Sequence, residues 1–274
     1  MTDHRQGDQP DHQRVEQVTD YATRVLAANP GPMTLDGTNT WILRAPDSDT
    51  VVVVDPGPML EEHLRSVLDE VAEYKVSTVL LTHGHFDHSE GAEWFAQHAN
   101  CPVRSVDPTF RIPTDHAHGL AEGDVITSGE LRIEVLPTPG HTMDSVCFWL
   151  PQDGSLLTGD TVLGRGTSVV AHPDGALGPY LDSLEHLRAF ANSPAGVARL
   201  LPGHGPVIDD PGAVLTHYLK HRQERLEQVR TAVADGYTTP KAIVRHVYAD
   251  VDPILWPAAE RSVHAQLDYL NGAL

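Results

Sequence analysis

Four side chains that bind divalent metals crowd into one short stretch of this 274-residue chain. They are His83, His85, Asp87 and His88, separated only by Gly84 and Phe86. Imidazole nitrogen and carboxylate oxygen are ligands for zinc and for other divalent metals of similar character. Gly84 permits the tight turn through which such neighbours converge on one point. The alternative is a polar loop of solvated histidines, but this density of ligands at metal-site spacing favours a metal site.

Three more side chains of the same kind stand in glycine-bearing loops further along the chain: His141, Asp160 and His204. Each of the four loops follows an apolar run that is typical of a buried strand, over residues 76–81, 131–136, 155–158 and 199–201. Strand ends fix positions and glycines let backbones approach closely. We therefore expect the four loops to meet and to form a site for two metals. His116 and His118 also have ligand spacing, but no apolar strand precedes them, so we do not assign them as ligands.

Asp55 ends another apolar run, residues 51–54, directly before a Pro-Gly-Pro turn. A carboxylate at such a strand end can orient a metal-bound histidine from behind. It can equally cap the turn that follows. The local sequence leaves both interpretations open.

The remaining pattern describes a strand-rich body followed by helices. Further strands are indicated over 40–43 and 145–150, and amphipathic helices over 60–74, 90–98 and 181–190. Past Pro211 the spacing predicts three helices: one closed by Gly236, one opened by Thr239-Pro240, and a last one over 257–270. We divide the chain into a flexible leader (1–20), a catalytic domain (21–212) and a small helical domain (213–274).

Composition narrows the classes of function. The net charge of -19 argues against wide, non-specific binding of duplex nucleic acid. The two cysteines, Cys101 and Cys147, form no metal-binding or disulfide pattern. No apolar run is long enough for a membrane span, and the first twenty residues resemble neither a secretory signal nor a transit peptide. We expect a cytoplasmic protein, and the oligomeric state stays open.

The motifs together resemble those of the metallo-β-lactamase superfamily. The matching stretches are Thr82-His83-Gly84-His85-Phe86-Asp87-His88, Thr138-Pro139-Gly140-His141-Thr142, Gly159-Asp160 and Pro202-Gly203-His204-Gly205. Three further stretches are similar to the β-lactamase-like protein 2 group, which includes a mitochondrial single-strand endoribonuclease: Asn29-Pro30-Gly31-Pro32, Gly37-Thr38-Asn39-Thr40 and the residues from His221 to Val229. The resemblance implies an α/β fold, a four-layer αββα sandwich, followed by a C-terminal winged-helix-like domain.

The resemblance also implies a ligand set. His83, His85 and His141 would hold a first zinc, Asp87, His88 and His204 a second, and Asp160 would bridge the two. Iron or manganese fits the same ligands. One major class of antibiotic-hydrolysing members uses a cysteine ligand, whereas Asp160 takes the bridging place here, which disfavours β-lactamase activity.

Two metals in such a site hold a bridging hydroxide that is a nucleophile at neutral pH. Asp87 is our candidate for orienting it. The first hypothesis for the substrate is single-stranded RNA, from the resemblance. The second is a thioester or another small ester, as in glyoxalase II-type relatives. A third reading is a non-catalytic, metal-stabilised protein that binds a partner. His172, Tyr180 and His118 are candidates for the general acid, and Tyr180 is preferred as a substrate contact because of its place in the resembling stretch.

Overall fold

The computed structural model describes residues 15–113, 118–194 and 196–272. Two sheets form its centre. The first has six strands in chain order, and its first three pairings are antiparallel and its last two parallel: β1 (Val15–Gln17), β2 (Ala22–Leu26), β3 (Asn39–Leu43), β4 (Thr50–Val54), β5 (Lys75–Leu80) and β6 (Val103–Arg104). The second has the order β11-β10-β9-β8-β7: β7 (Val125–Ser128), β8 (Leu131–Pro137), β9 (Val146–Leu150), β10 (Ser155–Gly159) and β11 (Arg199–Pro202). In that sheet only β10 and β11 run parallel.

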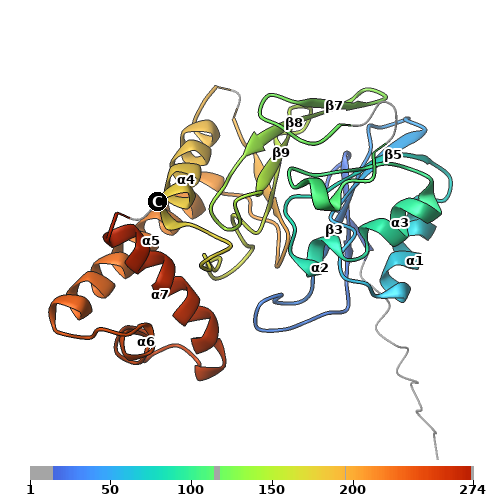
Figure 1. Cartoon of the computed structure of the whole chain (residues 1–274). Helices are drawn as coiled ribbons and strands as arrows, with labels where there is room; N and C mark the ends of the chain where they lie inside the picture. The colour runs from blue at the N-terminus through green and yellow to red at the C-terminus, as the bar shows by residue number, and fades with distance from the viewer. Residues whose placement is uncertain (1–14, 114–117, 195, 273–274) are drawn as a thin grey trace, which may run out of the picture.

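The sheets pack face to face, and helices cover both outer faces (Figure 1). Strand β4 shows why its valine run is continuous. Val52 and Val54 point into the core between the sheets, whereas Val51 and Val53 pack beneath the helices α1 (Glu61–Glu70) and α3 (Ala92–Ala99). Both faces are covered, so alternating side chains are apolar on either side. The expected four-layer αββα sandwich is confirmed.

The outer face of the second sheet is covered by α4 (Leu177–Ala191) and by the first half of α5 (Pro211–Ala234). Leu184 and Leu215 pack there against Trp149 and Leu200. The second half of α5 packs instead against α6 (Pro240–Val247) and α7 (Trp256–Leu270), through Val229 and its neighbours. Helix α5 therefore belongs to both parts of the molecule, and the boundary predicted at 212/213 lies within its first turn.

Short elements complete the described chain. They are α2 (Phe86–Ser89) and the 3-10 turns η1 (Pro108–Phe110) and η2 (Pro253–Leu255). No strand follows β11 within the described residues, which extend to 272. Among the described residues, no helix combines the length and the apolar character of a membrane span.

The predicted leader over 1–20 is too long. Residues 15–17 form β1 and pair with β2, and Val18 packs against the core between the sheets. Strand β1 is exposed and only three residues long, so backbone hydrogen bonds to β2 hold it. It has no apolar pattern from which a strand could be predicted. Residues 1–14 of the leader lie outside the described part. Strand β7 and helix α2 were also missed, and the helix predicted over 60–74 ends at Glu70.

The predicted cap of α6 offers a test of stability. The Thr239 hydroxyl oxygen accepts a hydrogen bond from the Ala242 backbone N–H at 3.3 Å, and Pro240 occupies the first helical turn. We expect Thr239→Ala to lower the free energy of unfolding by about 1 kcal/mol in urea denaturation. Thr231→Ala, at an exposed position inside α5, is the control and should change it little or raise it slightly. Equal effects of the two substitutions would contradict the cap.

Candidate metal centre

Seven predicted ligands from four loops lie together at one edge of the two sheets. The segment after β5 carries four of them, two in the loop and two on the short helix α2, and the loops after β8, β10 and β11 carry one each. In the first group, the His85 Nδ1 atom lies 3.1 Å from His83 Nε2 and 3.1 Å from His141 Nε2. Three imidazole nitrogens that converge in this way are a set of lone pairs directed at a single point, as in a three-histidine metal site.

The second group lies beside the first. The His204 Nε2 atom is 3.2 Å from His88 Nε2 and 3.1 Å from Asp87 Oδ2. His88 and His204 are fully buried, while the Asp87 side chain keeps about a third of its surface open. A carboxylate at the open side of a buried pair of imidazoles can bind a metal and still face a substrate.

Asp160 faces both groups. Its Oδ1 atom lies 3.4 Å from His88 Nε2 and 3.4 Å from His204 Nε2, and its Oδ2 atom lies 3.7 Å from His141 Nε2. The Oδ1 atom is buried and forms no hydrogen bond. A buried carboxylate oxygen without a hydrogen bond is costly unless a cation compensates it. The donor set and this orphaned oxygen both fit divalent metal, which these histidine and aspartate side chains would hold.

Hydrogen bonds on the far side of each ring set the ring orientation. The Asp55 carboxylate accepts from His88 Nδ1 at 2.9 Å and from the Thr82 hydroxyl at 2.6 Å, and its other oxygen accepts from the Thr82 backbone N–H at 2.8 Å. Asp55 holds the left-handed backbone conformation, with φ of 49°, which places its carboxylate under the loop. The structure thus places Asp55 behind a predicted ligand rather than in a turn cap alone.

The other rings are held similarly. His141 Nδ1 lies 2.7 Å from the Val169 carbonyl, and His204 Nδ1 lies 3.0 Å from the Gly37 carbonyl. His85 Nε2 lies 2.8 Å from Asp174 Oδ2. A ring N–H donated outward leaves the opposite nitrogen unprotonated toward the metal position. Asp174 escaped the sequence analysis because it stands in an irregular stretch after Pro173, where no periodicity or motif marks it.

Burial and neighbouring charges shift the pKa values of several side chains in the site. Burial lowers the pKa of His83 and brings that of His141 to about 4, so both rings are neutral at pH 7. Burial also lowers the pKa of His204, but the nearby Asp160 carboxylate outweighs it and raises the pKa to about 9. Burial raises the pKa of Asp87, yet its hydrogen bond with His204 brings it to about 2. The lowered pKa values of Asp87 and Asp160 keep both carboxylates ionised at pH 7, which suits cation binding, whereas a metal bound by His204 would displace a proton from that ring.

The candidates for the general acid lie in different places. Tyr180 is fully buried, its hydroxyl donates to the Thr161 carbonyl at 2.7 Å, and burial raises its pKa. Its role as a direct substrate contact is therefore wrong: it lies on the inward face of α4, beneath the loop of His141. His118 is exposed and lines no cavity that borders the ligands, and His116 lies outside the described residues. His172 does border the site.

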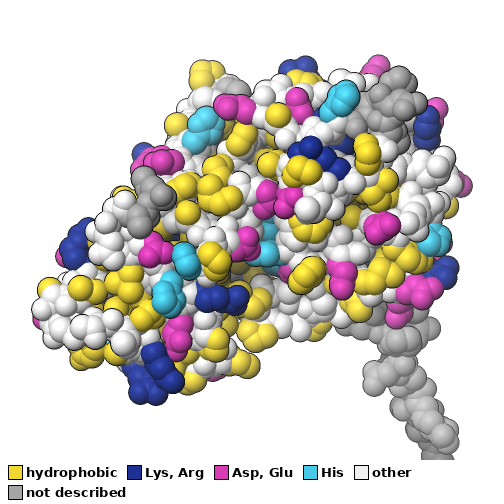
Figure 2. All heavy atoms as spheres, viewed as in Figure 1, with side chains coloured by type: hydrophobic (Ala, Val, Ile, Leu, Met, Phe, Trp, Pro, Cys, Tyr) yellow, Lys and Arg dark blue, Asp and Glu magenta, His cyan; other side chains and the backbone are white. Residues whose placement is uncertain are grey.

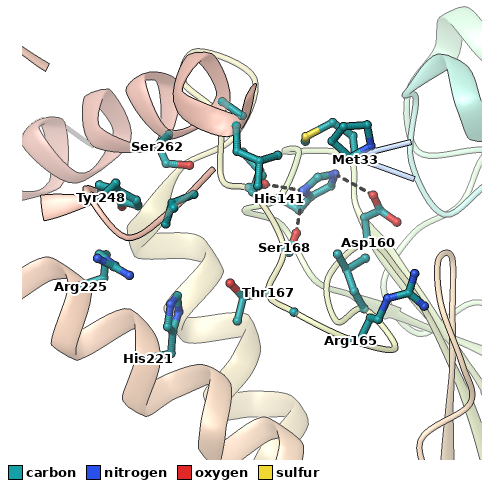
Figure 3. Close-up of a pocket in the computed structure, with 18 of the residues that line it drawn as sticks. Met33, His141, Asp160, Arg165, Thr167, Ser168, His221, Arg225, Tyr248 and Ser262 are labelled. Carbon is teal, nitrogen blue, oxygen red and sulfur yellow. Dashed lines mark hydrogen bonds and ion pairs between the residues drawn. The ribbon is translucent and has the colours of Figure 1, made fainter. Parts of the chain in front are cut away.

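Two cavities open next to the ligands, and neither was foreseen from the sequence. One, of about 230 Å³, is bordered by His85, Asp87, His141 and Asp160 and by residues beyond them: Met33, Val169, Ala171, His172, Pro173, Asp174 and Arg261. The other, of about 310 Å³, extends from His141 and Asp160 to the C-terminal helices (Figure 3). Because helices α5 and α7 contribute to these walls, the C-terminal part of the chain shapes the approach to the site.

Comparison with known proteins agrees with this geometry. Residues 33–204 match the family model described as the metallo-beta-lactamase superfamily, and residues 239–271 match the beta-lactamase associated winged helix domain. The chain belongs to the metallo-β-lactamase superfamily, whose members are generally hydrolases, and it carries the associated winged-helix domain.

The chain is also similar to individual proteins along most of its length. The chain is 32% identical to a beta-lactamase-like protein 2 homolog of Drosophila melanogaster, over 94% of this chain and 90% of that protein. It is 31% identical to an atrochrysone carboxyl ACP thioesterase of Aspergillus fumigatus, over 82% of this chain and 68% of that protein. Its fold is similar to the structure of a metallo-beta-lactamase family protein from Thermus thermophilus, with a TM-score of 0.76, 22% identity, and coverage of 93% and 95% of the two chains.

The contact between Asp55 and His88 can be tested without touching a ligand. We expect Asp55→Asn to lower metal affinity about 10–100-fold, because an amide cannot hold the His88 Nδ1–H as a carboxylate does. Metal content after dialysis and isothermal titration of zinc into the metal-free protein measure the effect. Asp209→Asn, an exposed carboxylate far along the chain, is the matched control and should bind as the unaltered protein does. An unchanged affinity for zinc in Asp55→Asn would show that Asp55 does not contribute to metal binding.

Proposed function

We propose that this chain is a two-metal hydrolase that cleaves a small ester or thioester. The observation that carries the proposal is the pair of ligand groups that share Asp160, three histidines on one side and Asp87, His88 and His204 on the other. When bound there, two divalent metals, zinc or alternatively iron or manganese, supply a nucleophile derived from water at neutral pH and polarise the substrate oxygen. Asp87, with its partly open carboxylate, would orient the attacking water.

Three features favour a small acyl substrate over RNA. The larger cavity beside the ligands has mostly apolar walls, which suits an acyl group. The whole chain is strongly acidic, and in Figure 2 the Lys and Arg side chains appear on this face as separate groups among acidic ones. On α5, Lys220 and Arg230 pair with neighbouring glutamates and provide no free basic surface. The thioesterase among the relatives supports the same choice.

Cleavage of single-stranded RNA is the second candidate. It is favoured by the resemblance to the β-lactamase-like protein 2 group and by Arg222 and Arg225, which border the larger cavity and could contact a phosphate. The two candidates differ in their response to salt. RNA binding weakens steeply with ionic strength because many counterions are released, whereas a small acyl substrate releases few and should respond little.

His172 is our candidate for the proton donor. It borders the smaller cavity together with Asp87 and Asp160, and its Nε2 atom lies 3.2 Å from Asp268 Oδ2 on α7. In ester cleavage the acyl carbon gains the hydroxyl, its bond to the leaving oxygen breaks, and His172 gives a proton to that oxygen. The Asp268 carboxylate would hold the ring in position.

Asp87→Ala tests the metal pair. We expect turnover of the preferred substrate to fall at least about 100-fold and metal content to drop, because a ligand and the water-orienting group are lost together. Wild type and variant are assayed with zinc on acyl thioesters, oxyesters, a β-lactam and labelled single-stranded RNA, and circular dichroism checks the fold. Asp182→Ala, an exposed carboxylate on α4, is the control. A fully active Asp87→Ala protein would refute the two-metal assignment.

His172→Ala tests the proton donor through the leaving group. An alkoxide is a poor leaving group and needs the proton, so we expect turnover of an alkyl oxyester to fall about 100-fold. A thiolate leaves more readily, since thiols are far more acidic than alcohols, so the matched thioester should lose much less. His186→Ala, on the exposed side of α4, is the control. Equal losses on both substrates would deny His172 this role.

A further inference from the structure

The larger cavity has two chemically different ends. At one end are the ligands His141 and Asp160, and at the other are side chains from α5, η2 and α7 (Figure 3). Figure 3 shows His221, Arg225 and Tyr248 on the side away from Asp160. Much of the wall between them is apolar, formed by Leu163, Val169, Val251, Leu255, Ala258 and Ala259. A volume of about 310 Å³ suits part or all of a small molecule.

Two arginines at the helical end have no carboxylate partner within the described part of the chain. Arg225 Nη1 donates to the Val247 carbonyl at 2.7 Å, and its guanidinium lies over the Tyr248 ring, 4.4 Å from the centroid. Arg222 donates to the Ser168 carbonyl and lies over the Tyr180 ring. Ion pairs with carboxylates occupy seven other arginines, of which Arg165 also borders this cavity, at the Asp160 end: Arg24, Arg65, Arg104, Arg132, Arg165, Arg188 and Arg230.

The same end of the cavity contains polar atoms without partners. Arg222 is only 6% exposed, and its buried Nε atom forms no hydrogen bond. The buried Nδ1 atom of His221 also forms none. Burial and the two neighbouring arginines lower the pKa of His221 to about 4, so the ring is neutral at pH 7 and can donate through one nitrogen. Buried donors of this kind are normally paired, so they indicate an acceptor that belongs to a ligand.

Carboxylates that could supply that acceptor are missing from the described wall. Asp160 is the one carboxylate that borders the cavity there, and it faces the metal ligands instead. A half-buried guanidinium, a buried guanidinium and a neutral imidazole next to apolar walls form a site for an anion attached to an apolar group. A polynucleotide would instead require a continuous basic groove along the surface.

We propose that this cavity binds an ester or thioester whose apolar body lies between the metals and α5, and whose anionic group is held by Arg225 with Arg222 and His221. The proposal rests on the proposed function and adds the substrate class to it. The anion is a carboxylate or a phosphate. It is carried either at the far end of the acyl group or on the leaving thiol, as in a phosphate-bearing carrier.

Substrate pairs of equal length distinguish these sources. Octanoyl groups, and octanedioyl groups of the same length that end in a free ω-carboxylate, are each presented as thioesters of N-acetylcysteamine, which carries no phosphate, and of coenzyme A. A carboxylate source predicts that the ω-carboxy group raises kcat/KM about 100-fold on N-acetylcysteamine. A phosphate source predicts that coenzyme A raises it by a similar factor for the plain octanoyl group. Either preference supports the proposal, and the absence of both overturns it.

Arg225→Met identifies the residue responsible. We expect the ratio of kcat/KM between anionic and neutral substrates to fall from about 100 to near one, and Arg225→Lys to keep part of it because the charge remains. Arg230→Met, on the same helix and paired with Glu227, should leave the ratio unchanged. If Arg225→Met lowers both substrates equally at full metal content, the proposal is refuted.

A binding measurement separates this proposal from the proposed function. Isothermal titration compares octanedioate and inorganic phosphate with octanoate on the zinc-loaded wild type and on Arg225→Met. We expect octanedioate, inorganic phosphate or both to bind the wild type about 10-fold more tightly than octanoate does. We expect this difference in affinity to disappear in Arg225→Met. If the wild type shows this binding preference but hydrolyses no ester or thioester, the anion site is supported and the proposed function is refuted. Equal binding in wild type and variant would refute the site.

Discussion

The site depends on the meeting of two sheets along one edge, and backbone hydrogen bonds between the sheets hold that edge. The Val146 N–H donates to the Thr82 carbonyl at 2.9 Å, and the Asn39 N–H donates to the Gly203 carbonyl at 2.7 Å. Both bonds lie one residue from a ligand, His83 in the first case and His204 in the second. The candidate ligands from different sheets therefore keep a fixed separation, which is the preorganisation that the proposed metal site would require.

Glycines make this close approach possible. A Cβ atom at Gly203 would lie 2.7 Å from His88 Cε1 and 2.8 Å from Asp160 Oδ1, so any side chain there would push into the ligands. At Gly140, with φ of +138°, a Cβ atom would lie 2.3 Å from the backbone of Tyr180. The glycines beside the ligands therefore serve packing as well as turning. Their neighbours can be buried and close together only because these positions carry no side chain.

Local patterns were sufficient for the buried strands that lead into the predicted ligand loops and for those loops, because each depends on a few adjacent residues, whereas the exposed strand β1 and the short strand β7 were not predicted. Features that arise only when distant segments meet could not be foreseen. Asp174 reaches His85 across 89 positions of sequence, and the larger cavity requires α5 and α7 to pack beside the loop of Ser168. Tyr180 was assigned as a substrate contact from the family resemblance, although its spacing in the helix indicates a buried residue. It shares helical spacing with Leu184 and Leu187, which is the pattern of a buried helix face.

Helix α5 packs against the C-terminal helices and also contacts the loop beside the candidate metal ligands. Arg222 donates to the Ser168 carbonyl, and the Ser168 hydroxyl lies 3.1 Å from His141 Nδ1. A side chain of α5 thus fixes the residue that contacts a ligand ring, while Arg225, one turn later, borders the cavity beside it. A movement of α5 would therefore alter both the orientation of His141 and the shape of the cavity. Helix α5 and helix α7 of the winged-helix domain together form this wall of the cavity beside the candidate metal ligands.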